Sequence, residues 1–84
     1  MSIVALFNKN YIYDTILNIS HTNISSLPAE IGNLINLQEL CLSYNQLSLL
    51  PAEIGNLINL KELLLNHNQL SLLPADTEGA SIHL

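Results

Sequence analysis

The sequence predicts a small α/β solenoid in which near-identical units stack side by side. The first observation is an internal repeat: residues 28–50 and 51–73 are consecutive 23-residue units that differ at only four positions. A fixed period of about 20 to 50 residues is typical of solenoids, propellers and arrays. The second is the alternation of apolar and polar residues within each unit, which predicts a short strand with one buried face.

The N-terminal part is the least regular portion of the predicted solenoid. Shifting the repeat back by one period places apolar residues on the strand and return positions: Leu17, Ile19, Ile24 and Leu27. Asp14 stands where a Leu is expected, and Thr22 stands where the later units carry Asn. We therefore expect residues 1–16 to form a degenerate or cap-like segment, and residues 17–73 to hold a partial first unit followed by two full units.

In each full unit a convex segment precedes the strand. Pro28 and Pro51 suit the first position of a short helix. Gly32 and Gly55, four residues later, can adopt the left-handed conformation that ends such a helix. The apolar residues expected to point inward are Ile31, Leu34, Leu37, Ile54, Leu57 and Leu60. Each unit should thus carry a short helical or 3-10 segment on the convex side of an arc.

The strands should contain Leu40–Leu42 in one unit and Leu63–Leu65 in the next. Stacking of identical units places such strands in a parallel sheet, about 4.8 Å apart. Asn45 and Asn68 follow the strands, and an amide side chain offers both donors and an acceptor to the backbone groups of the turn. Because an unpaired buried backbone group costs about 1 to 3 kcal/mol, we assign structural roles to these Asn residues and to Thr22.

The repeat pattern stops after Pro74. Thr77 stands where Ile54 stood in the preceding unit, and the surrounding Asp, Gly and Ser residues are typical of loops. We therefore expect residues 74–84 to be a C-terminal tail. The last strand, near residues 61–66, would then present an unpaired edge.

Residues 37–47 and 60–70 both match the pattern L-x-x-L-x-L-x-x-N-x-L in the same register. The chain therefore resembles leucine-rich repeat proteins, specifically the 23-residue LPxxIxxLxxLxxLxLxxNxL subtype found in Ras-group proteins, in Scribble- and Erbin-like scaffolds and in bacterial proteins. The resemblance covers residues 17–74. It implies an arc-shaped solenoid, with parallel strands on the concave face, that binds a protein partner through that face.

The outward strand positions of the two full units should line up as columns on that face. The side chains that we predict to contact a partner are Glu39, Cys41, Ser43, Tyr44, Glu62, Leu64, Asn66 and His67. Three of the four positions that differ between the units are among these columns, so the scaffold is constant while the surface varies. Tyr44 is the expected anchor, because interface energy concentrates in aromatic and Arg side chains.

Composition excludes several classes of partner. The net charge is −5 and the only cationic side chains are Lys9 and Lys61, whereas nucleic acids and anionic membranes require clustered Lys and Arg. No run approaches about 18 consecutive apolar residues, as a membrane span requires. A single cysteine, Cys41, excludes an internal disulfide. We expect a cytoplasmic protein, or one located in the host cytosol if it is a bacterial effector.

Residues that could support catalysis or metal binding have simpler interpretations. Glu39 and Glu62 resemble a carboxylate pair, but on an open sheet solvated carboxylates are expected rather than acid–base catalysts. His21 and His67 should lie two strands apart, about 10 Å, which is too far to share a zinc ion. Neither Lys nor His flanks Cys41 in sequence. We therefore predict no enzymatic activity, no metal and no cofactor.

The sequence is best interpreted as a non-catalytic protein–protein interaction module. Two alternatives remain open: a truncated fragment or relic of a longer repeat protein, and a regulatory repeat segment of a larger enzyme or receptor. Ile35, Ile58, Leu49 and Leu72 are apolar at positions outside the core pattern. Exposed apolar residues of this kind predict self-association or docking onto further repeats.

Overall fold

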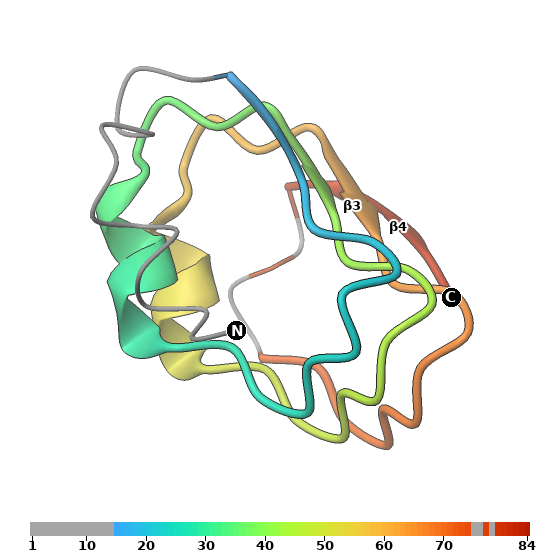
Figure 1. Ribbon diagram of the computed structural model, residues 1–84. Helices are drawn as coiled ribbons and strands as arrows, with labels where there is room; N and C mark the ends of the chain where they lie inside the picture. Colours follow the sequence, from blue (N-terminus) through green and yellow to red (C-terminus); the bar gives the residue numbers. More distant parts are fainter. Residues whose placement is uncertain (1–14, 75–76, 78) are drawn as a thin grey trace.

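The computed structural model describes residues 15–74, 77 and 79–84. Within these residues, four short strands form one sheet in the order β1-β2-β3-β4, and every neighbouring pair is parallel (Figure 1). The strands are β1 (Ile16–Asn18), β2 (Glu39–Cys41), β3 (Glu62–Leu64) and β4 (Ser81–His83). Each strand lies beside the next one in the chain, because the chain coils in one direction. This arrangement confirms the predicted α/β solenoid.

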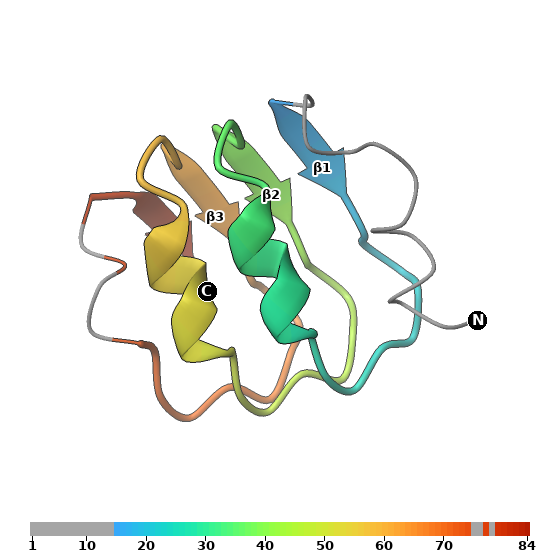
Figure 2. The same ribbon diagram turned by 90° about the vertical axis from the view of Figure 1, so that its left-hand side faces the viewer.

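In the described part of the chain, the side opposite the sheet carries two 3-10 helices, η2 (Ala29–Asn33) and η3 (Ala52–Asn56) (Figure 2). Pro28 and Pro51 each precede the first helical residue in extended backbone. The carbonyl of each Pro accepts the first hydrogen bond of its helix, from Ile31 and Ile54 respectively. Each Pro was predicted to be the first residue of its helix, but it lies immediately before that residue.

The predicted role of Gly32 and Gly55 as left-handed helix ends is wrong. No described glycine has a positive φ, and both residues lie inside the 3-10 helices. Gly32 is required instead by a close approach between units. A Cβ atom there would lie 2.9 Å from the carbonyl oxygen of Glu53, closer than side chains tolerate. The two helices can therefore pack backbone against backbone at this point.

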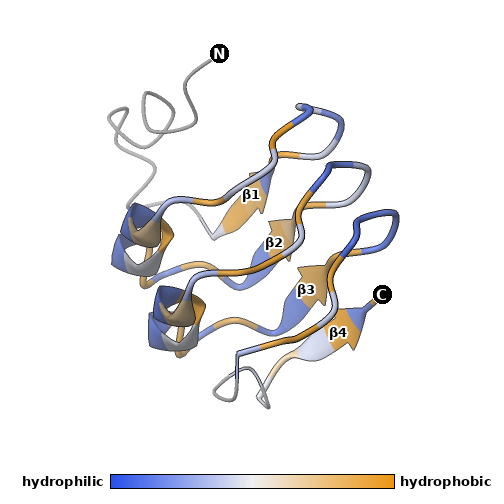
Figure 3. Ribbon diagram, turned by 90° about the horizontal axis from the view of Figure 1, so that it is seen from below, coloured by the Kyte–Doolittle hydropathy of each residue, from blue (hydrophilic) through white to orange (hydrophobic). Residues whose placement is uncertain are grey.

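The core is a spine of buried Leu and Ile side chains. Figure 3 shows hydrophobic residues recurring along the strands and along the segments that connect them to the 3-10 helices. The register pairs Leu17 with Leu40 and Leu40 with Leu63, so that successive units contribute equivalent side chains. Leu40 and Leu63 are fully buried. Burial of each such side chain stabilises the fold by about 1.5 to 3 kcal/mol, so the repeated Leu positions supply most of the driving force for stacking.

The end of the chain differs from the predicted tail. Strand β4 pairs with β3, and Ser81 donates its backbone N–H to the carbonyl of Lys61 at 2.7 Å. Thr77 is buried, and its hydroxyl donates to the carbonyl of Pro74 at 2.9 Å. Strand β4 follows β3 sooner than the repeat predicts: Glu62 pairs with Ser81, and these two residues are closer in sequence than Glu39 and Glu62 are. A search at the 23-residue period therefore misses this strand. The expected free edge on β3 is therefore wrong: β4 covers it.

At the other end, the predicted cap-like segment 1–16 falls mainly on residues 1–14, which lie outside the described residues. Ile16 already belongs to β1. Across the described ranges, none of the helices is long and apolar enough to span a bilayer.

Candidate functional site

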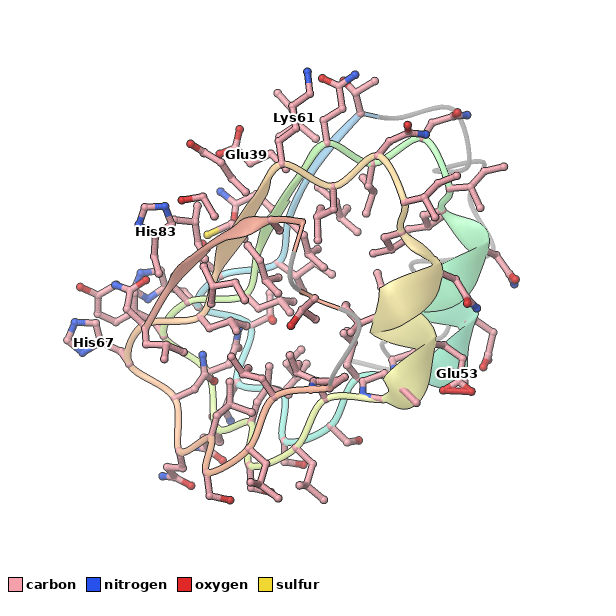
Figure 4. The ribbon with its side chains drawn as sticks, turned by 180° about the vertical axis from the view of Figure 1, so that it is seen from behind. Glu39, Glu53, Lys61, His67 and His83 are labelled. Atoms are coloured by element: carbon pink, nitrogen blue, oxygen red, sulfur yellow. The ribbon has the colours of Figure 1, made fainter. Side chains whose placement is uncertain are left out.

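The outward-facing side chains of the sheet form columns across the strands. The register sets Glu39 beside Glu62 and Cys41 beside Leu64. Strand β1 extends the second column with Asn18, and β4 extends it with His83. Figure 4 shows Glu39, His67 and His83 on the sheet side of the molecule, while Glu53 lies on the side of the 3-10 helices. The sheet register thus gathers the chain's varied side chains on one face.

Beyond the strands, three rings form a continuous stack that we call the ring ladder: His21, Tyr44 and His67. The ring centroids of His21 and Tyr44 lie 4.4 Å apart, and those of Tyr44 and His67 lie 4.2 Å apart. The interplanar angles of 12° and 11° show that the rings are nearly parallel. Both faces of Tyr44 are therefore covered, and its edge and hydroxyl are presented to solvent.

The backbone turn at each ring is what places the ladder outside the sheet. All three residues have positive φ, between 56° at His21 and 62° at His67. Tyr44 donates its N–H to the carbonyl of Asn66 at 3.0 Å, and His21 donates to Ser43 at 3.2 Å, so pairing between units continues past the strands. The repeat predicted a column of Tyr44 and His67 but neither the turn nor the stack. The signal for them was an aromatic or His residue recurring every 23 positions.

Ser43 differs from its predicted role as a partner-contacting residue. It is buried, and its hydroxyl is hydrogen-bonded to the side-chain oxygen of Asn66. Asn66 is half-buried and shares this bond, so it offers less free surface than an outward strand position suggests. In the turn after β2, the Ser43 side chain thus faces Asn66 of the next unit instead of solvent. Of the predicted contact residues only Ser43 is buried; the others lie in the Glu column, the Cys41–Leu64 column and the ring ladder, together with the half-buried Asn66.

Two Asn side chains fix the turns beneath the ladder. Asn45 accepts hydrogen bonds from the backbone N–H groups of Thr22 at 3.1 Å and Ile24 at 3.2 Å. It donates to the carbonyls of Ile19 at 2.9 Å and Leu42 at 3.0 Å. The Thr22 hydroxyl donates to Ile19 at 2.8 Å. One buried amide thus joins the turns of two adjacent units.

Asn68 repeats this arrangement one unit later. It donates to the carbonyls of Leu42 at 2.9 Å and Leu65 at 3.0 Å, and accepts from the N–H of Leu47 at 3.0 Å. Both Asn side chains thus bond to their own unit and to the preceding one. They hold the turns beneath the ring ladder in place, with Asn45 buried and Asn68 half-buried.

The two carboxylates on this face, those of Glu39 and Glu62, form no ion pair with any described residue. Glu39 is half-buried and Glu62 is exposed. Cys41 is a half-buried free thiol. No group of three or more His, Cys, Asp or Glu side chains in the described ranges could hold a metal ion. The arrangement offers an open, shallow surface that suits contact with another macromolecule.

Comparison with known proteins agrees with this architecture. A family profile described as "Leucine rich repeat" matches residues 15–72. A solved structure of a leucine-rich repeat protein from Leptospira interrogans is similar, with 42% sequence identity and a TM-score of 0.73. The match covers 79% of this chain but only 18% of that protein, so this chain corresponds to a small part of its length. A search of curated proteins found no match.

Proposed function

Since this chain belongs to the leucine-rich repeat family, we propose that it binds a protein partner through the outward face of its sheet, the concave face of such an arc, and that it does so without catalysis. The units differ in two of the exposed columns, while the Glu column is the same in both. Cys41 is replaced by Leu64, and Tyr44 by His67, while the buried Leu and Asn positions are unchanged. The surface is thus variable on a constant frame, as partner recognition by a repeat scaffold requires.

The ring ladder supports this proposal most directly. Tyr44 is 47% exposed although it is stacked on both sides. Stacking fixes the ring before any partner arrives, so little side-chain entropy is lost on binding. A fixed, amphipathic aromatic side chain is the type of residue that concentrates binding energy at interfaces.

A pull-down with the full chain as bait, followed by identification of the captured proteins, tests the assignment. The variant Tyr44→Ala/His67→Ala should lose the specific partner while its circular dichroism spectrum stays unchanged. The matched control is Ile35→Ala/Ile58→Ala, which removes exposed side chains outside the sheet face. If the control abolishes capture and the ladder variant does not, the binding surface lies elsewhere.

The exposed apolar residues support self-association as a second proposal. Leu49, Leu72 and Leu84 are 62%, 71% and 76% exposed. Leu49 and Leu72 occupy equivalent positions in the two full units and lie beside the half-buried Leu50 and Leu73. Strand β4 also leaves one edge without a neighbouring strand among the described residues. Apolar surface and an open sheet edge both favour contact with a second copy.

A further inference from the structure

We infer that the partner presents an extended, positively charged segment that crosses the outward face of the sheet along the strand direction. This inference rests on the proposed function and specifies its ligand. Three features carry it: the acidic pair Glu39–Glu62, the apolar column of Cys41 and Leu64, and the polar edges of the ring ladder.

The acidic pair is the feature that favours a cation in the partner. Glu39 and Glu62 are direct neighbours in the parallel register of β2 and β3. Like charges on adjacent strands destabilise a sheet, and no described residue forms an ion pair with either carboxylate. Lys61, the only cationic side chain of Lys or Arg type in the described residues, is exposed and makes no such pair. A Lys or Arg side chain between the two carboxylates would relieve their repulsion.

The column next to the acidic pair favours an apolar side chain. Cys41 and Leu64 are half-buried neighbours two residues further along the same strands. Alternate residues of an extended peptide point to the same side. A segment that places its cation over the acidic pair therefore places its next inward side chain over Cys41 and Leu64.

The ring ladder contributes hydrogen-bonding groups to the surface at the edges of its rings. Tyr44 has both faces covered by His21 and His67, so it cannot stack on a partner's ring. Its hydroxyl and the imidazole nitrogens remain as donors and acceptors at the ring edges. These groups suit the polar backbone of an extended chain. From Glu39 to Tyr44 an extended chain covers about 16 Å, so a segment of about five residues spans all three features.

Selection of peptides from a random phage-displayed library on the full chain tests this inference. The enriched sequences are synthesised, and their affinities are measured for the wild type and for two matched double variants. Glu39→Gln/Glu62→Gln removes two charges from the sheet face, and Glu30→Gln/Glu53→Gln removes two charges from equivalent positions on the 3-10 helices. The control thus has the same net charge and leaves the proposed surface intact.

We expect the enriched peptides to carry Lys or Arg and an apolar residue two positions away. Their affinity should fall about three- to tenfold in Glu39→Gln/Glu62→Gln and stay within about twofold in the control. It should also weaken with salt. Equal losses in the two double variants, or enrichment of neutral or acidic peptides, would overturn the cationic ligand.

The result also separates this inference from the proposed function. Peptides that lose affinity in Tyr44→Ala/His67→Ala but carry no cation would leave the binding face in place and reject its charge preference. Peptides that bind the ladder variant and Glu39→Gln/Glu62→Gln as tightly as they bind the wild type would contact another surface, and both proposals would then be wrong.

Discussion

His21, Tyr44 and His67 each occupy the left-handed backbone region. Such a conformation costs a residue other than Gly about 1 to 3 kcal/mol. An aromatic stack returns about 0.5 to 1.5 kcal/mol per ring pair, so stacking offsets only part of this cost. The remainder has to come from the turn itself, where Asn45 and the backbone bond from Tyr44 to Asn66 over-determine the conformation. The exposed ladder thus depends on buried amides.

Substitution of Asn45 tests this dependence. Asn45→Leu leaves the backbone N–H groups of Thr22 and Ile24 without their acceptor, and should lower the free energy of unfolding by about 1 to 3 kcal/mol. The control Asn59→Leu removes an exposed amide that makes one bond, to the carbonyl of Ile35, and should have little effect. Urea denaturation measures both. Identical curves for Asn45→Leu and the wild type would contradict the structural role.

At the scale of the element, strand β4 is the part that decides where the sheet ends. It pairs with β3 through backbone bonds, including one from the N–H of Leu65 to the carbonyl of His83 at 2.7 Å. Ile82 packs against the core cluster although it is only half-buried. The pairing satisfies backbone groups that would otherwise form an open edge on β3.

The variant Ser81→Pro tests whether β4 is paired. Proline removes the N–H that Ser81 donates to Lys61 and prevents the regular ladder bond. We expect the amide of Leu65 to lose protection from hydrogen exchange, while the amide of Leu42, bonded to Leu64 between β2 and β3, stays protected. Rapid exchange of Leu65 in the wild type would show that β4 does not pair in solution.

At the scale of the whole molecule, each unit contacts chiefly its neighbours, so stability is close to a sum of unit and interface terms. The apolar side chains that remain exposed, Leu49, Leu72 and Leu84, are therefore the surface most available for contact with a second copy. The proposed partner-binding residues and the exposed Leu residues proposed for self-association are different, so one proposal does not exclude the other.

Sedimentation of the full chain over a range of concentrations tests self-association. We expect reversible dimers or larger species, which Leu49→Ser/Leu72→Ser should shift towards monomer because the buried apolar area falls. The matched control Tyr44→Ala/His67→Ala should leave the assembly state unchanged, since the ring ladder lies on another face. A compact monomer at every concentration would reject this proposal.

The 23-residue period was enough to predict the solenoid, the inward Leu spine and the parallel register of the first three strands, because these features recur with that period along the chain. It also placed Glu39 beside Glu62 and Tyr44 beside His67. Coordinates were needed to show that Ser43 is buried, that Gly32 is fixed by a close contact with Glu53, and that Ser81–His83 forms a fourth strand. These features depend on backbone turns and on contacts between units, which no spacing of residue types specifies. The stacked rings belong with them, since their faces meet only after both neighbouring turns adopt the left-handed conformation.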